Sequence, residues 1–268
     1  MSRLPEYYEY LHANPELSRQ EFRTAAFLMK TLADMGYSPV RIGQTGVHAD
    51  LVVDEKFPWV LLRSDMDALP VTEETGVSYA SQNPGVMHAC GHDAHMSMLL
   101  SAAEELRDKN LPQNIRFLFR PAEEGVTGAV EMLAAGAVPK NTVAVFGMHV
   151  WPGVEKGKVL AKLEEIAAKT AAEYKTQTEV NYSSFAPAVI NPEELTQKVQ
   201  QLLPNVVTEM APTRIAEDFS RYQEKAPGVL MWLGVGDTPS LHNGKFLVPK
   251  EVLPVGVDSW IRLAMHKW

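Results

Sequence analysis

Short apolar runs alternate with amphipathic segments along the first 150 residues, and this alternation limits the folds open to the chain. Strands that alternate with helices of ten to fifteen residues are typical of a sheet covered by helices. We therefore predict an α/β fold: a mixed, mostly parallel central sheet with helices on both faces. The predicted segments are strands at His48–Val53 and Trp59–Arg63, a helix at His95–Arg107, a strand at Ile115–Phe119, a helix at Gly128–Ala135 and a strand at Val143–Met148.

The flanking regions carry further signals. Ser18 followed by Glu21 has the spacing of a capping box, which predicts a helix over about residues 18–35. Polar residues, glycine and proline fill residues 66–86, so this stretch is predicted to be a loop. The last third is predicted to contain a helix at Leu163–Glu173, a strand at Thr178–Tyr182, helices at Glu193–Leu202 and Glu217–Lys225, a strand at Val229–Val235 and a helix from about Lys250.

Composition narrows the class of protein. The 268 residues, 46% of them hydrophobic, suffice for one substantial core, and we expect a single domain over residues 1–268. The net charge of −8, without a cluster of Lys and Arg, makes nucleic acid an unexpected partner. A single cysteine suits a reducing compartment. No stretch has the roughly 20 apolar residues of a membrane span, so we expect a cytoplasmic protein without membrane association.

The segment Met87–His95 reads Met-His-Ala-Cys-Gly-His-Asp-Ala-His, and it includes the only cysteine of the chain. Thiolate, imidazole and carboxylate groups in such proximity are typical of one half of a metal site. The remaining donors follow predicted strands: Asp65 after the second, Glu123 and Glu124 after the third, His149 after the fourth. In α/β sheets ligands bind beyond the carboxyl ends of the strands, so the motif positions and the fold agree.

Five side chains are candidate metal ligands, and Glu123 stands next to one of them without being needed as a ligand. A single catalytic ion usually takes about three protein ligands and water, so five donors favour two divalent ions with a shared ligand. Glu123 is then free to act as general base on a water between the ions. Thiolate and imidazole favour zinc, nickel or cobalt, and carboxylate also admits manganese. The five candidates are Cys90, His92, Glu124, His149 and His242.

Each of these residues also has a purely structural interpretation. A lone cysteine is usually a small buried apolar residue, and paired glutamates usually lie on a solvated face. A histidine at a strand end, like His149, can be a satisfied core residue. His88 and His95 either line the pocket or orient a ligand. We assign His12, His48 and His266 to structure or solvent.

Seven stretches of the chain, in this order, resemble the dinuclear metallo-amidohydrolases, a group that includes N-acyl-amino-acid deacetylases, N-acetyldiaminopimelate deacetylases and plant indole-acetyl-amino-acid hydrolases within the aminoacylase and carboxypeptidase G-like superfamily. The resemblance covers nearly the whole chain. The stretches are Leu11–Leu17, Arg63–Pro70, Met87–His95, Pro121–Gly125, Gly147–His149, Glu217–Phe219 and Leu241–Asn243.

The resemblance implies roles for these residues and a reaction. It assigns the five candidates above as ligands of two divalent ions, Glu123 as proton acceptor, and Asp65 as the active-site carboxylate that orients the metal cluster. The implied reaction is hydrolysis of an N-acyl amino acid, for example an N-acetyl amino acid, by a metal-activated water. A dipeptidase or carboxypeptidase uses the same groups and stays an alternative, because only the substrate pocket distinguishes it.

One departure from the resembled family concerns an inserted lid domain. Family members carry about a hundred residues between a strand like Gly157–Val159 and a helix like Leu163–Lys169, whereas here the two are nearly contiguous. The lid of the family mediates dimerisation and supplies a histidine that holds the developing oxyanion. With the insertion near 159–163 missing, we expect a monomer with impaired turnover. A catalytically silent metal-binding or scaffold protein is the alternative.

Overall fold

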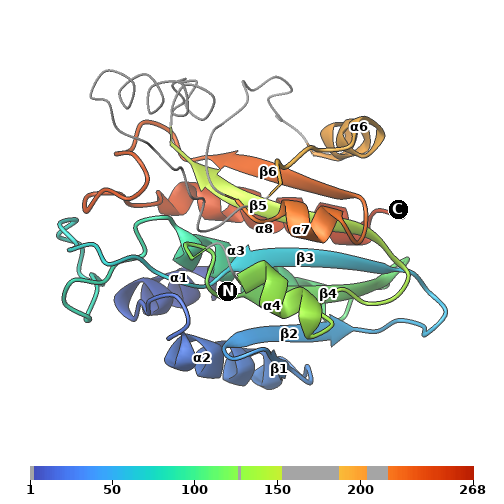
Figure 1. The fold of residues 1–268 in the computed structure, drawn as a ribbon, viewed down its shortest axis with the longest axis horizontal. Coiled ribbons are helices and arrows are strands. Elements are labelled where there is room, and N and C mark those ends of the chain that lie inside the picture. Colours follow the sequence, from blue (N-terminus) through green and yellow to red (C-terminus); the bar gives the residue numbers. More distant parts are fainter. Residues whose placement is uncertain (1–2, 126–127, 153–186, 204–216) are drawn as a thin grey trace, which may run out of the picture.

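The computed structural model describes residues 3–125, 128–152, 187–203 and 217–268. Within these residues one six-stranded sheet has the order β1-β2-β4-β3-β5-β6 (Figure 1). The strands are β1 Val40–Ile42, β2 Gly46–Leu51, β3 Trp59–Asp65, β4 Asn114–Arg120, β5 Thr142–Trp151 and β6 Gly228–Gly234.

The sheet is mixed, and its larger part is parallel. β2 pairs antiparallel with β1 and with β4, whereas β4, β3, β5 and β6 run parallel to one another. Leu61 at the centre of β3 pairs with Arg116 of β4 and with Val145 of β5. The carboxyl ends of four strands therefore share one edge of the sheet, which is where ligands bind in such folds.

Alternation along the strands divides the core between the two faces of the sheet. Val60 and Leu62 of β3 belong to one buried cluster, whereas Leu61 between them belongs to the other. Helices α1, α2, α3 and α8 contribute to the first cluster, and α4 and α7 to the second. The helices are α1 Leu4–Ala13, α2 Phe22–Asp34, α3 His92–Leu106, α4 Gly128–Ala134, α6 Glu193–Leu202, α7 Ser220–Gln223 and α8 Leu253–Met265.

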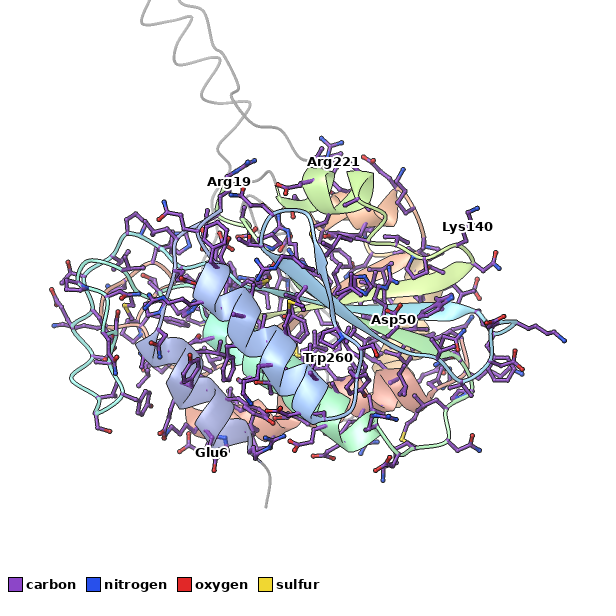
Figure 2. All side chains as sticks on the ribbon, turned by 90° about the horizontal axis from the view of Figure 1, so that it is seen from below. Glu6, Arg19, Asp50, Lys140, Arg221 and Trp260 are labelled. Carbon is purple, nitrogen blue, oxygen red and sulfur yellow. The ribbon has the colours of Figure 1, made fainter. Side chains whose placement is uncertain are left out.

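The figures show the same two layers of helices. In Figure 1, α4 and α7 lie in front of the sheet, and α3 and α8 lie behind it. Figure 2 shows Glu6 and Lys140 at the periphery, whereas Trp260 of α8 lies in the interior, where it is 1% exposed. The predicted α/β class and the helices on both faces are confirmed.

Several predicted boundaries were wrong. The helix predicted over about residues 18–35 begins only at Phe22, because Ser18 and Glu21 form no capping box. Instead the Ser18 hydroxyl donates to Asp67, and the buried Glu21 carboxylate accepts from the Thr45 hydroxyl. α1 and the three-residue strand β1 were not predicted, and α3 begins at His92 instead of His95.

Some of the remaining predictions fall within the described residues, and others fall outside them. Residues 66–86 contain no helix or strand apart from isolated bridges at Ala68 and Leu69, as predicted for a loop. The helix predicted over residues 217–225 is shorter, with α7 covering Ser220–Gln223. The predicted helix 163–173 and strand 178–182 lie outside the described residues, as does the predicted lid insertion point near 159–163. The single-domain assignment stays a prediction.

None of the helices in the described part of the chain is both long enough and apolar enough to cross a bilayer.

Candidate metal centre

Cys90 and His92 are placed by the turn that starts α3. Gly91 between them caps the helix with a φ of +80°, a left-handed conformation that glycine adopts without strain. A Cβ atom at this position would also collide with the side chain of Val150 at the end of β5. The turn thus brings the thiol and the imidazole against the end of β5, the strand that carries His149.

The side chains predicted to bind metal converge at the carboxyl edge of the sheet. Their donor atoms form overlapping groups of three, each with all its atoms within 4.8 Å of one another. The Cys90 Sγ atom lies 3.5 Å from His149 Nε2, and His242 Nε2 lies 3.7 Å from a Glu124 carboxylate oxygen. The groups are Cys90 with His92 and His149, Cys90 with Glu124 and His242, and His92 with Glu123 and Glu124.

Hydrogen bonds on the far side of two imidazoles turn their other nitrogens toward this cluster. His92 Nδ1 lies 2.7 Å from the main-chain oxygen of Asp67, and His149 Nδ1 lies 2.7 Å from that of Val150. Because a carbonyl oxygen only accepts, both Nδ1 atoms carry the proton and leave Nε2 free to bind a cation.

The donor set fits divalent cations. His92 Nε2 and a Glu124 carboxylate oxygen are buried and have no hydrogen-bond partner. A buried polar atom without a partner is costly, and a cation between these atoms removes that cost. Thiolate, imidazole and carboxylate together suit borderline metals such as zinc.

Asp67 connects the segment of Glu123 and Glu124 with His92, and the sequence analysis did not identify it as a site residue. Its carboxylate accepts hydrogen bonds from the main-chain N–H groups of Glu123 at 2.9 Å and Glu124 at 3.0 Å, and from the Ser18 hydroxyl at 2.6 Å. The same residue holds His92 through its main-chain oxygen. The available signal was its position two residues after Asp65 in the stretch Arg63–Pro70.

Asp65 reaches the cluster less directly. Its carboxylate lies 2.6 Å from the Arg63 guanidinium and 3.2 Å from that of Arg120, and all three side chains are fully buried. Its other oxygen lies 3.5 Å from Nδ1 of His95, whose Nε2 accepts a hydrogen bond from the main-chain N–H of Val150. One oxygen of Asp65 also lies within 4.8 Å of donor nitrogens of both His92 and His95. The orienting role of Asp65 stays a prediction.

Two further carboxylates close the floor of the site. Glu217 and Asp218 lie within reach of Glu123, with one oxygen of each within 4.8 Å of the others. Arg63 donates to Glu217 at 3.0 Å, and Arg120 donates to Asp218. Two buried guanidinium groups thus pair with three buried carboxylates near the candidate general base.

Burial and neighbouring charges shift several protonation equilibria. Burial and the negative charge of Glu217 raise the pKa of Glu123 well above its usual range. Burial, together with the imidazoles of His95 and His92, holds the pKa of His149 well below its usual value. Burial raises the pKa of the Cys90 thiol. A coordinated cation acts in the opposite direction on a thiol, because coordination deprotonates it.

The histidines with open assignments have distinct surroundings. His95 packs against His149 with ring centroids 4.5 Å apart, so it supports the cluster from behind. Burial lowers the pKa of His95 to about 4, and it does the same for His88, whose ring nitrogens are both buried without a hydrogen-bond partner. His12, assigned from the sequence to structure or solvent, is buried and lies between two carboxylates.

Comparison with known proteins gives a consistent result. Residues 61–266 match the sequence model of peptidase family M20/M25/M40. An N-acyl-L-amino acid amidohydrolase of Geobacillus stearothermophilus is 45% identical over 154 residues, which are 56% of this chain and 41% of that protein. An N-acetyl-L-cysteine deacetylase of Bacillus subtilis is 42% identical over 163 residues, 59% of this chain and 39% of that protein. The chain thus spans about two fifths of the length of these curated relatives.

A solved structure extends the likeness to the fold. The Bacillus subtilis YXEP protein, described as a dinuclear metal-binding peptidase from the M20 family, superposes with a TM-score of 0.84 at 26% sequence identity. The superposition covers 98% of this chain and 96% of that chain.

Proposed function

Because the chain belongs to peptidase family M20/M25/M40, we propose that it is a metal-dependent amidohydrolase core that hydrolyses N-acyl amino acids. The family and the metallo-hydrolase relationship are the premise, and the substrate and mechanism are the proposal. One observation carries it. Five donor side chains from four separated segments of the chain lie in overlapping groups within 4.8 Å, directly beside a buried carboxyl group.

Five side chains would hold two divalent ions, zinc, manganese, nickel or cobalt. When bound, such ions polarise the scissile carbonyl and acidify a water molecule. The two imidazoles tied at Nδ1 supply Nε2, which fixes the direction of binding before any ion arrives. The five are Cys90, His92, Glu124, His149 and His242.

Glu123 would move the proton in this reaction. Its carboxylate takes a proton from water and delivers it to the leaving nitrogen of the amide. The hydrogen bond from its main-chain N–H to Asp67 fixes the backbone from which the side chain projects. Because the side chain is only 6% exposed, bulk water has little access to the proton that it carries.

The substrate class follows from the relatives and stays open in detail. Two curated relatives, at 45% and 42% identity, are named for N-acyl and N-acetyl amino acids, which makes a small N-acyl amino acid the first candidate. A dipeptide presents the same amide beside a free carboxylate, so a dipeptidase or carboxypeptidase activity is tested with the same assay. Nucleic acid and membranes are not part of the proposal.

The predicted loss of the lid bears on rate and assembly. Loss of one hydrogen-bond donor to the oxyanion typically lowers turnover about a hundredfold or more. We therefore propose a monomer with slow turnover, and light scattering after gel filtration measures its mass. A dimer, or turnover at the rate of a lid-bearing relative, contradicts this part of the proposal.

The deciding experiment combines metal analysis with an assay on N-acetyl amino acids. The wild-type protein should bind two ions and hydrolyse the substrate, whereas Glu123→Gln should keep both ions and lose turnover by about a hundredfold or more. Glu105→Gln, on the exposed face of α3, is the matched control and should behave as wild type. If the protein binds metal but shows no turnover that Glu123→Gln abolishes, the alternative of a catalytically silent metal-binding protein is supported.

A further inference from the structure

His12 of α1 is buried, and both of its ring nitrogens lie against carboxylates. Nδ1 lies 2.6 Å from an oxygen of Asp93, and Nε2 lies 3.0 Å from an oxygen of Glu73. Burial alone would lower the pKa of His12, but the hydrogen bonds and charges of these two partners raise it to about 9. At neutral pH both nitrogens are therefore protonated and donate, one to each carboxylate.

Glu73 is the centre of the loop that His12 holds. Its carboxylate also accepts from the Thr75 hydroxyl and, at 2.6 Å, from the main-chain N–H of Ser81. A loop without helix or strand has few other means of keeping one conformation. The charged pair with His12 therefore ties residues 73–81 to α1.

The next residue along the loop contacts the segment that carries His242. The main-chain N–H of Glu74 donates to the main-chain oxygen of Gly244 at 2.7 Å. A Cβ atom on Gly244 would lie only 2.5 Å from the main-chain oxygen of Thr72, so the two backbones are in direct contact. Gly244 follows His242 by two residues.

His242 depends on such contacts for its position. Its side chain is 54% exposed, compared with 12% for Glu124 beside it. Its main chain has a φ of +65°, and its N–H donates to the Ala89 main-chain oxygen at 2.8 Å. The Ala89 contact holds this exposed segment at His242 itself, and the contact of Gly244 with residues 72–74 holds it two residues later.

Asp93, the second partner of His12, lies next to the candidate ligand His92. Asp93 follows His92 directly in the first turn of α3, and its other carboxylate oxygen accepts from the main-chain N–H of Ala94. His12 thus contacts the element that carries His92 and the loop that braces His242. No other described residue bridges these two segments with a charged side chain.

We propose that His12 is a positioning residue for the metal centre, which sets the affinity for the more weakly held ion by fixing the backbone under His242. The inference rests on the proposed function, because that function supplies the metal ions. It adds His12, which contacts none of the metal-binding atoms, to the residues that determine metal affinity. Loss of an orienting contact at one remove from a ligand typically weakens metal binding tenfold to a hundredfold.

The test uses His12→Gln and the gentler Glu73→Gln, with His48→Gln as matched control. His48 is also a buried histidine near a carboxylate, 3.3 Å from Asp50, but it lies on β2. Zinc affinity is measured by competition with a coloured chelator. We expect one of the two zinc ions to bind about tenfold or more weakly in both test variants, and neither to change in the control.

Hydrogen exchange of the metal-free proteins supplies a readout without metal or substrate. Exchange should accelerate in peptides covering residues 70–76 and 240–246 in both test variants, and stay unchanged over β2. Acceleration confined to residues 70–76, or unchanged zinc affinity in a folded His12→Gln variant, overturns the proposal. A wild-type protein that binds zinc but has no turnover overturns the proposed function alone, since affinity and exchange still decide the role of His12.

Discussion

The carboxylate of Asp67 accepts a hydrogen bond from the main-chain N–H of Glu123 at 2.9 Å. The same carboxylate holds the N–H of Glu124, and the main-chain oxygen of Asp67 holds the imidazole of His92. The candidate base and two candidate ligands are therefore positioned from one residue, which is itself 1% exposed. A change at this residue acts on all three groups together.

Replacing Asp67 with asparagine tests this relationship. Asparagine keeps the volume but offers one acceptor oxygen in place of two, so at least one of the amides of Glu123 and Glu124 loses its partner. We expect Asp67→Asn to weaken zinc binding by about tenfold to a hundredfold in a chelator competition. Asp34→Asn, at an exposed ion pair of α2, is the control. Wild-type affinity in Asp67→Asn would show that the carboxylate only packs.

A second prediction concerns the turn between Cys90 and His92. Gly91→Ala forces a side chain into a left-handed conformation and against Val150, Phe246 and Val248. The conformation costs about 1–2 kcal/mol, and the overpacking adds about 1–3 kcal/mol. Gly76→Ala is the matched control, because Gly76 has a φ of +72° but no atom within 4 Å of the added Cβ. Urea unfolding should show a clearly larger loss for Gly91→Ala, and equal losses contradict the packing argument.

The buried charges beneath Glu123 give a third prediction. Arg120 is fully buried between Asp65 and Asp218, so Arg120→Leu removes one of the guanidinium groups that each of these buried carboxylates contacts. Breaking a buried ion pair in this way costs about 3–5 kcal/mol in the free energy of unfolding. Arg262→Ala removes an exposed pair with Asp258 on α8 and should cost less than about 1 kcal/mol. Chemical denaturation measures both variants, and a similar loss in the two is the contrary result.

The protonation of His12 predicts a pH dependence of stability. An unfolded histidine has a pKa of about 6.5, and in the folded protein the pKa of His12 is about 9. Since the folded value is the higher one, the contribution of His12 is complete below about pH 6.5 and is lost as the pH rises through about 9. The shift corresponds to at most about 3 kcal/mol.

The measurement compares wild type with His12→Gln by urea unfolding at about pH 6 and about pH 10. The difference in the free energy of unfolding between the two proteins should shrink at the higher pH. An equal difference between wild type and His12→Gln at both pH values contradicts a charged His12 in the folded protein.

The sheet could be predicted because its signal is local. Apolar runs such as Trp59–Arg63 and Val143–Met148 are long enough to identify strands, and polar residues at their ends identify the edge where ligands gather. Five of the six strands were predicted close to their observed bounds, with errors of a few residues at the ends. The missed strand β1 has only three residues, too few for a pattern with a period of two to show.

The errors arose where distant partners override local signals. Ser18 and Glu21 have capping-box spacing, but their side chains bind Asp67 and Thr45, which are 49 and 24 residues away. The partners of His12 are 81 and 61 residues away, so its burial between carboxylates leaves no trace in the adjacent sequence.

Asp67 was missed for a related reason. β3 ends at Asp65, and beyond a strand end the alternation of faces no longer tells which of two nearby carboxylates points inward. Only the positions of Glu123 and Glu124, more than fifty residues later, identify Asp67 as the residue that holds the cluster.

The hydrogen bond from His242 to Ala89 has a consequence for how the protein is made. On the ribosome the strands β1 to β5 emerge well before β6, which joins the sheet at its outer edge. His242 follows β6 along the chain and therefore emerges later still. A nascent chain that ends just after β6 thus carries the sheet and four of the five candidate donors, and the fifth donor, His242, is added only after all six strands have been made.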